Sequence, residues 1–399
     1  MIKLLPALFL ISFLAAQSQN PIADGKEKFL GSIHSATQIQ DFEQYWNQVT
    51  PENAGKWGSV ESTRDVYNFT QLDAAYDFAK QNGFPFRYHV LLWGNQQPSW
   101  IESLDPEEQL EEIEEWMDTV AARYPDIDYL EVINEPLHDP PSGSGNGNYL
   151  QALGGTGTTG YDWIVTGFRI AKERFPNVPL MINDYNILNN PTDANRYVTI
   201  INLLKEEGLI DIIGVQGHAF TTTTDNGTMQ TVLDLLASTE LPIMVTELDI
   251  DGPTSQEQLE EYQRIFPLLW EHPSVMGITL WGFRPGLWRN AQKAYLIDTD
   301  GSERPALIWL REYVENASFL LTQSEEMNWT LYPNPASDYL EIIAGEPVKG
   351  VIVIDLFGRQ LLKTSSNKLQ LPEDTPPGVY MVSIQTISGK SYVKKLKVE

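Results

Sequence analysis

Eight short apolar runs, of the kind that form buried strands, recur along most of this 399-residue chain. Segments with apolar residues at helical spacing separate nearly all of them. The runs are residues 29–33, 46–50, 85–93, 128–134, 179–184, 212–218, 241–247 and 276–281. Strands that alternate with helices pair in parallel, because each helix returns the chain to the same end of the sheet. The pattern predicts an α/β fold, a (β/α)8 barrel of the TIM type.

The helical segments are predicted over residues 72–81, 107–123, 162–175, 193–207, 229–237, 256–270 and 305–314. The connection between the first two strands, residues 34–45, is too short for a full crossover helix and is the weakest point of this count. From about Glu325 the pattern changes to short alternating strands punctuated by Pro, Gly and Asn. This change predicts a small all-β sandwich after the barrel.

The amino terminus combines a lysine, an apolar run and small residues before Gln17, which is typical of a secretory signal peptide. We therefore divide the chain into a signal peptide at 1–18, a barrel domain at 19–322 and a β-sandwich at 323–399. No later stretch is apolar for about 20 residues, so we expect no transmembrane segment. The chain has no cysteine, which excludes disulfides, zinc–thiolate sites and a cysteine nucleophile.

The formal net charge of −27 argues against nucleic acid or an anionic membrane surface as a partner, because both would be repelled. The many carboxylates between Asp105 and Trp116 are interpreted as a solvated helix face. Eleven Trp and 17 Tyr are many for this length. Their faces suit sugar rings, although we expect most of them in the core.

Polar and aromatic residues stand at the ends of six predicted strands. They are Trp93, Asn134 with Glu135, Asn183 with Asp184, Gln216 with His218, Glu247, and Trp281. In a (β/α)8 barrel the carboxyl ends of the strands meet at one mouth, where active sites form. One polar strand end is ordinary, but packing does not explain six in succession. The pattern predicts a site at this mouth.

Glu135 and Glu247 lie on the fourth and seventh predicted strands, so both side chains can project into the mouth. Glycoside hydrolysis requires two such carboxylates, one protonated and one ionised. His218 and Asp249 can extend a hydrogen-bonded chain from Glu247 that keeps it oriented and charged. Asp251 shares their face if the strand continues. The plainer alternatives stay open: a core histidine at 218 and a turn or cap residue at 249.

Seven blocks stand out, and all but the first contain one of these strand ends: NQVTPENAGKW, RYHVLLWGNQQPSW, VINEP, INDYN, IDIIGVQGHAF, VTELDI and GITLWGF. In this order they resemble the family 10 glycoside hydrolases, which are endo-β-1,4-xylanases that retain the anomeric configuration. The resemblance covers about residues 27 to 315. It implies a hydrolase acting on xylan, arabinoxylan and xylo-oligosaccharides without metal or cofactor.

The resemblance also implies a role for each matching residue. Glu135 is implied as general acid/base and Glu247 as nucleophile, with carboxyl groups about 5–5.5 Å apart. Catalytic support is implied for Asn134, Gln216, His218 and Asp249. The implied substrate-binding residues are Glu52, Asn53 and Lys56 on the non-reducing side, His89, Trp93 and Gln96 at the cleaved sugar, Trp281 and Trp288 as its aromatic walls, and Tyr185 on the leaving-group side.

The chain departs from the family pattern at Gly94 and Asn95, where His and Ser are common. Gly94 removes bulk near the cleft floor. The Gly-rich loop 139–157 is expected to shape the product side. Arg284 and Arg289 in the last barrel loop are interpreted either as surface residues or as groups that meet acidic or decorated side groups of the substrate.

The last residues contain YPNPASDYLEI, DLFGRQLL, TPPGVYMVSI and KKLKV. These pieces resemble the type A sorting domain of the type IX secretion system, which implies that machinery as a partner. It also implies a secreted protein, extracellular or attached to the cell surface. A carbohydrate-binding module is the alternative, but Trp329 is the only Trp there. We expect a monomer.

Two other functions remain as alternatives. A broader β-1,4-glycanase would use the same chemistry on glucan or cellobioside. A non-catalytic xylan-binding surface protein would lack one catalytic carboxylate, and this chain has both.

Overall fold

A computed structural model describes residues 20–143, 147–321, 329–355, 360–372, 375–387 and 391–399. The predicted signal peptide and the predicted boundary at residue 322 lie outside these ranges. Nine strands form one parallel sheet in the order β2-β1-β9-β8-β7-β6-β5-β3, with β4 beside β5. They are β1 Phe29–His34, β2 Val49–Pro51, β3 Arg87–Tyr88, β4 Leu92–Trp93, β5 Tyr129–Asn134, β6 Leu180–Asn183, β7 Ile212–Val215, β8 Ile243–Leu248 and β9 Val275–Leu280.

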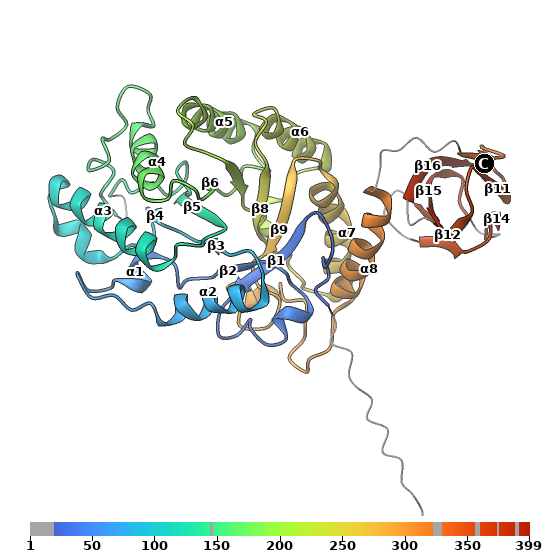
Figure 1. Cartoon of the computed structure of the whole chain (residues 1–399), viewed down its shortest axis with the longest axis horizontal. Coiled ribbons are helices and arrows are strands. Elements are labelled where there is room, and N and C mark those ends of the chain that lie inside the picture. The colour runs from blue at the N-terminus through green and yellow to red at the C-terminus, as the bar shows by residue number, and fades with distance from the viewer. Residues whose placement is uncertain (1–19, 144–146, 322–328, 356–359, 373–374, 388–390) are drawn as a thin grey trace, which may run out of the picture.

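The sheet curls into the predicted barrel, with helices around its outside (Figure 1). The third predicted strand is divided into β3 and β4, and a cis peptide bond joins His89 to Val90 between them. Closure between β2 and β3 rests on one parallel bridge from Val49 to Phe86. There the Val49 N–H donates to the Pro85 carbonyl at 3.0 Å.

Seven of the eight described helices follow the predicted segments, the short helix Trp57–Val60 was not predicted, and four start at a residue whose side chain caps them. The described helices are α1 Trp57–Val60, α2 Thr70–Asn82, α3 Pro106–Arg123, α4 Asp162–Arg174, α5 Pro191–Glu206, α6 Asn226–Ala237, α7 Ser255–Glu271 and α8 Pro305–Leu321. Asp105, Asn190, Asp225 and Thr254 each accept a hydrogen bond from a first-turn N–H, which satisfies an otherwise free donor. The first connection holds only a single 3-10 turn, Phe42–Gln44.

The barrel interior is layered. At its amino-terminal end Phe29, Met181, Ile212 and Met244 form an apolar plug. Above the plug, toward the carboxyl ends of the strands, the interior is polar and includes the fully buried side chain of Arg87. An apolar core packs the strands against the surrounding helices.

The carboxyl-terminal part is the predicted β-sandwich. One sheet has the order β10-β11-β14 and the other β13-β12-β15-β16, and all their pairings are antiparallel. Trp329 is only 3% exposed, in a core that both sheets share. The strands are β10 Trp329–Tyr332, β11 Tyr339–Ala344, β12 Val348–Asp355, β13 Gln360–Thr364, β14 Lys368–Gln370, β15 Gly378–Thr386 and β16 Ser391–Val398.

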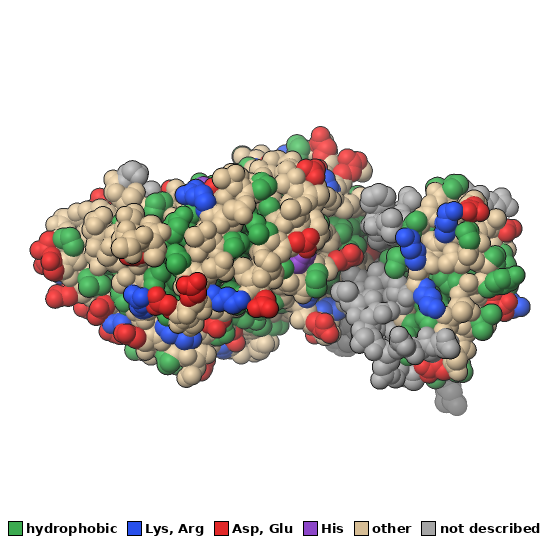
Figure 2. All heavy atoms as spheres, turned by 90° about the horizontal axis from the view of Figure 1, so that it is seen from above, with side chains coloured by type: hydrophobic (Ala, Val, Ile, Leu, Met, Phe, Trp, Pro, Cys, Tyr) green, Lys and Arg blue, Asp and Glu red, His purple; other side chains and the backbone are tan. Residues whose placement is uncertain are grey.

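Acidic side chains are spread over the barrel face seen in Figure 2 instead of gathering in one patch. Glu107, Glu108 and Glu111 on α3 are exposed, as expected for a solvated helix face. Among the described residues, no helix has both the length and the apolar character needed to cross a membrane.

Candidate active site

A cavity of about 450 Å³ lies at the carboxyl ends of the barrel strands. Fourteen of the fifteen sequence-predicted site residues line it, and Asp249 lies behind them. The lining residues are Glu52, Asn53, Lys56, His89, Trp93, Gln96, Asn134, Glu135, Asp139, Tyr185, Gln216, His218, Phe220, Glu247, Trp281 and Trp288.

Glu135 stands on a strained turn directly after β5. Its φ of 53° is in the left-handed region, which costs a residue with a side chain about 1–2 kcal/mol. The turn is held from outside, because the Leu137 N–H donates to the Asp184 carboxylate at 2.8 Å. His138 Nδ1 lies 2.7 Å from the same carboxylate. The turn leaves Glu135 buried in the cavity wall.

Two neutral N–H groups contact the Glu135 carboxyl group. Gln216 Nε2 donates to Oε1 at 2.7 Å, and Trp93 Nε1 donates to Oε2 at 2.9 Å. Burial raises the pKa of Glu135 well above its usual value, and the Gln216 hydrogen bond opposes this only in part. The negative charges of Glu247 and Asp184 raise it further. This environment favours the protonated form of the Glu135 carboxyl group.

Glu247 has the opposite surroundings. It lies within β8, where Asn183 Nδ2 donates to its Oε1 at 2.9 Å and His218 Nε2 lies 3.2 Å from its Oε2. Burial alone would raise the pKa of Glu247. The hydrogen bond from His218 and the positive charges of His89, His218 and Arg87 outweigh burial and lower that pKa to about 2. Glu247 is therefore ionised throughout the neutral range.

The predicted hydrogen-bonded chain behind Glu247 is present. His218 Nδ1 lies 2.6 Å from Asp249 Oδ2, so each ring nitrogen has a carboxylate partner. Burial alone would lower the pKa of His218, but Asp249 and Glu247 raise it to about 10. β8 ends at Leu248, so the condition for placing Asp251 on the same strand face is not met. Asp249 reaches His218 from the loop that follows.

Amide side chains connect the two carboxyl groups across the cavity. Asn134 Oδ1 accepts from Asn183 Nδ2 at 3.0 Å and from Gln216 Nε2 at 3.3 Å. Asn183 also bonds Glu247, and Gln216 also bonds Glu135. The two carboxyl groups are thus fixed relative to one another by a single network.

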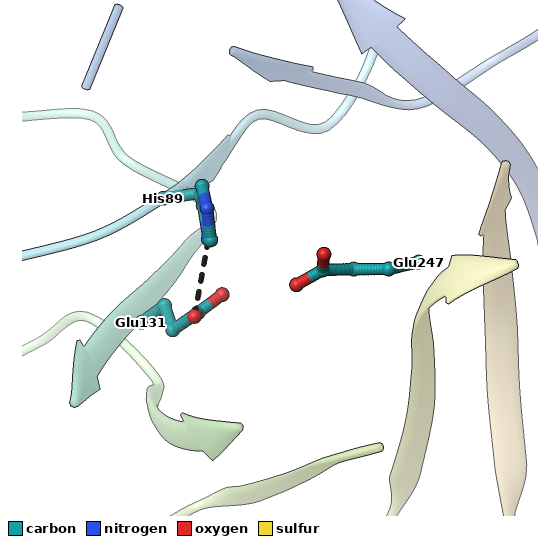
Figure 3. Close-up of side chains that lie close together, drawn as sticks. All are labelled: His89, Glu131 and Glu247. Carbon is teal, nitrogen blue, oxygen red and sulfur yellow. Dashed lines mark hydrogen bonds and ion pairs between the residues drawn. The ribbon is translucent and has the colours of Figure 1, made fainter. Parts of the chain in front are cut away.

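A charged cluster lies beneath Glu247. His89 Nδ1 is 3.1 Å from Glu131, and the carboxylate of Glu247 faces both residues from β8 (Figure 3). Ligand atoms of these three side chains lie within 4.8 Å of one another, a spacing that can hold a metal ion. Arg87 adds a positive charge to this cluster, with Nη1 2.6 Å from Glu131. Through this cluster, the buried positive charge of Arg87 acts on Glu247.

The rim of the cavity combines hydrogen-bonding groups and aromatic faces. Lys56 donates to Asn53 at 2.8 Å and to Gln96 at 2.6 Å, which joins the segments after β2 and β4. Trp281 is buried, whereas Trp288 is 49% exposed. Trp288 Nε1 donates to Asp249 at 3.0 Å.

Neither arginine of the last barrel loop is a free surface residue. Arg284 Nη2 lies 3.0 Å from Asp41, and Arg289 Nη2 lies 2.6 Å from Asp251. The Arg289 guanidinium also lies 5.5 Å from the ring centre of Trp288. These acidic partners belong to the chain itself, so a contact of either arginine with side groups of the substrate stays a prediction.

Several residues of this site are absent from the sequence-based set. Asp139 and Phe220 line the cavity. Behind the lining, Asn183 donates to Glu247, and Arg87 donates to Glu131, which contacts His89. Asn183 was visible as a polar strand end, and Arg87 is a charge inside an apolar run. Phe220 follows His218 by two residues, without any distinguishing pattern.

Two family models match the chain. The one described as "Glycosyl hydrolase family 10" matches residues 16–313, and "Secretion system C-terminal sorting domain" matches residues 330–399. The chain is similar to "Endo-1,4-beta-xylanase B" of Cellvibrio japonicus, with 38% identity over 71% of this chain and 45% of that protein. It therefore spans about half the length of that relative. The chain is also similar to "Endo-1,4-beta-xylanase B" of Thermotoga neapolitana, with 30% identity over 68% of this chain and 81% of that protein.

Solved structures show the same similarity. Native xylanase 10B from Thermotoga maritima superposes with a TM-score of 0.66 at 26% identity, over 74% of this chain and 98% of that one. Xylanase 10B from Thermotoga petrophila RKU-1, solved in complex with xylobiose, gives 0.65 at 26% identity, over 74% and 97%. The predicted (β/α)8 barrel is confirmed.

Proposed function

The chain belongs to glycosyl hydrolase family 10, and on that premise we propose that it is an endo-1,4-β-xylanase. The proposed substrates are xylan, arabinoxylan and xylo-oligosaccharides. One observation carries the proposal: two carboxyl groups face one cavity, and their surroundings shift their pKa values in opposite directions. That division of protonation states is what glycoside hydrolysis needs.

The first step is the formation of a glycosyl-enzyme. The ionised Glu247 attacks the anomeric carbon, while Glu135 gives its proton to the departing glycosidic oxygen. His218 holds the carboxylate of Glu247 by the contact at 3.2 Å, and the imidazolium offsets part of its negative charge. Asn134, fixed by Asn183 and Gln216, is assigned to the sugar 2-hydroxyl.

In the second step Glu135, now ionised, removes a proton from water. The resulting hydroxide attacks the anomeric carbon and releases Glu247, so the sugar leaves with retained configuration. Each half of the reaction thus uses Glu135 in the opposite protonation state. A group with a raised pKa serves both as donor and as acceptor.

The cavity lining supports a sugar substrate. Trp281 and Trp288 present ring faces, while Glu52, Asn53 and Lys56 supply carboxylate, amide and ammonium groups for hydroxyls. Apolar faces with a few placed polar groups are typical of sugar sites. The xylanase relatives and the xylobiose complex support xylan over other β-1,4-glycans.

Product analysis of the purified mature chain tests this proposal. Glucuronoarabinoxylan and carboxymethyl cellulose are digested in parallel, and the products are separated by chromatography and their anomeric form followed by NMR. Short xylo-oligosaccharides of retained configuration, with no product from cellulose, are expected. Comparable cleavage of both polymers would instead indicate a broader β-1,4-glycanase. An inverted product would refute the double displacement.

For the carboxyl-terminal part we propose export by a type IX secretion system, supported by the family match over residues 330–399. We also propose the division at residues 18 and 322 and a monomeric enzyme. Buried Trp329 offers no platform for a sugar, which argues against a carbohydrate-binding module. A chain truncated after residue 322 should keep its activity in the cell and fail to reach the medium. Secretion of the truncated chain would contradict the assignment.

A further inference from the structure

A second carboxyl group, Asp139, lies against Glu135. The N–H groups of His138 and Asp139 both donate to the Glu135 carbonyl, at 3.2 and 2.8 Å. This turn folds residue 139 back over residue 135. The two side chains are hydrogen-bonded, and the half-buried Asp139 lines the cavity beside Tyr185.

Gly94 fixes the path of this segment. Its N–H donates to the Asp139 carbonyl at 3.1 Å. A Cβ atom at residue 94 would lie 2.1 Å from that carbonyl oxygen and 2.5 Å from the Pro140 backbone. Backbone atoms cannot move away as cheaply as a side chain. Any larger residue at 94 would therefore displace Asp139 from its place beside Glu135.

A hydrogen bond between two carboxyl groups requires a proton between them. Both oxygens of Glu135 already accept N–H groups, from Gln216 and Trp93, and neither of those supplies an acidic proton. Glu135, whose pKa is raised, is therefore the donor of the proton in this hydrogen bond, as in close carboxyl pairs of other enzymes.

Other charged and titratable groups also surround Glu135 and act on it together with Asp139. They are Glu247 on β8, Asp184 and Tyr185 after β6, Lys56 after β2, and His138, which is ion-paired with Asp184. None of these is hydrogen-bonded to the Glu135 carboxyl group in the structure. Asp139 is distinguished by that direct bond.

We propose that Asp139 is a positioning residue that holds the proton of Glu135 in the empty site and returns Glu135 to a strong base after that proton has left. The proposal rests on the xylanase function proposed above. In the first step the Glu135 O–H bond breaks and the proton joins the leaving oxygen. Glu135 is then ionised beside a second carboxyl group, and the hydrogen bond between the two side chains is lost.

Recovery of the hydrogen bond to Asp139 favours the second step. Removal of a proton from water forms the Glu135 O–H bond again, and the hydroxide joins the anomeric carbon as the bond to Glu247 breaks. The Glu135–Asp139 hydrogen bond is restored. Loss of Asp139 should therefore slow hydrolysis of the glycosyl-enzyme as well as shift the pH at which Glu135 loses its proton.

The test compares three variants of the mature chain. Asp139→Asn removes the second carboxyl group and can donate a hydrogen bond to ionised Glu135. Gly94→Ala should push the intact Asp139 away. Glu102→Gln makes the same charge change at an exposed residue of the 3-10 turn Ser99–Ser103 and is the matched control. Melting temperatures establish that each variant is folded.

The first readout is the pH dependence of kcat/KM on xylo-oligosaccharides. The basic limb of this profile reports the pKa of the general acid in the free enzyme. Asp139→Asn and Gly94→Ala should move this limb to lower pH, by on the order of one unit for Asp139→Asn. Glu102→Gln should leave it in place. A uniform loss of activity without movement of the limb would mean that Asp139 is only structural, and would overturn the proposal.

The second readout needs no turnover. Carbon-13 NMR of chains with labelled glutamate carboxyl groups follows the titration of Glu135, assigned with Glu135→Gln. The midpoint should fall in Asp139→Asn, and an unchanged midpoint would overturn the inference. A wild-type chain inactive on xylan at every pH would refute the proposed function alone, because this titration would still decide the role of Asp139.

Discussion

The two walls of the cavity hold the same functional group in opposite states. On one wall Glu135 sits on a strained turn among neutral donors and negative charges. On the other, Glu247 sits within a regular strand above a buried arginine and beside a protonated histidine. Burial is nearly complete for both residues, so it does not explain the difference between their pKa values. The sign of the neighbouring charges explains it, negative around Glu135 and positive around Glu247.

Removing Glu247 should have the largest effect. Without the nucleophile, Glu247→Ala should lower kcat on xylan on the order of 10⁶-fold, comparable to the loss of nucleophiles in other hydrolases. The measurement is initial rates of reducing-sugar release, with circular dichroism to establish folding. Near wild-type turnover by the folded variant would assign the nucleophile to another residue.

Removing Glu135 should cost less and should depend on the leaving group. Glu135→Ala should lower kcat on xylan about 10²–10⁴-fold, the usual contribution of a general acid. The first step, formation of the glycosyl-enzyme, should be slowed very little on an aryl xylobioside with an acidic phenol. That leaving group departs without needing a proton from Glu135. Pre-steady-state rates of phenol release on the two substrates provide the comparison. Equal losses on both would contradict the role as acid.

The charge on the Glu247 wall can be changed separately. Activity needs ionised Glu247, so it is present above the pKa of that residue and is lost as the pH falls through it, near pH 2 in the wild type. His218→Asn keeps a donor but removes the positive charge. The acidic limb of kcat/KM should move upward by about one to two pH units. An acidic limb that stays in place would mean that Arg87 and His89 alone keep the pKa of Glu247 low.

The smallest effect is expected at the rim. Arg289 faces the exposed ring of Trp288 and pairs with Asp251. Arg289→Leu should raise KM about two- to fivefold, since a cation–π contact at an exposed site is worth about 0.5–1 kcal/mol. The kcat value should change little, in contrast to the variants above. Michaelis–Menten kinetics on xylohexaose measure both, and a dominant loss of kcat would place Arg289 closer to the chemistry.

Much of this comparison could be predicted from the sequence. Apolar runs that end in Asn134–Glu135 and Glu247 indicate the strands, and the barrel brings their ends together. The family prediction is confirmed by the match over residues 16–313. The chain of contacts from Glu247 through His218 to Asp249 also followed from residue types at neighbouring strand ends.

The other contacts of the two glutamates depend on backbone geometry, which the periodicity of the sequence does not encode. Asp139 reaches Glu135 because of a positive φ and a close approach at Gly94. Arg87 acts on Glu247 only because the barrel interior places β3 opposite β8, and its Nη2 donates to the Thr246 carbonyl at 2.9 Å. β8 ends at Leu248, several residues before Gly252, the next residue that would signal a break.

The barrel closure between β2 and β3, held by the bridge from Val49 to Phe86, has a consequence for heat tolerance. The proposed sugar-binding residues lie on both sides of this seam, and Lys56 spans it to Gln96 at 2.6 Å. A bound oligosaccharide would contact the residues on both sides of the seam and so hold β2 and β3 together for as long as it stays bound. Because a ligand that binds only the closed barrel stabilises it by mass action, xylan fragments should delay thermal inactivation, and the enzyme should be most fragile once its substrate is exhausted.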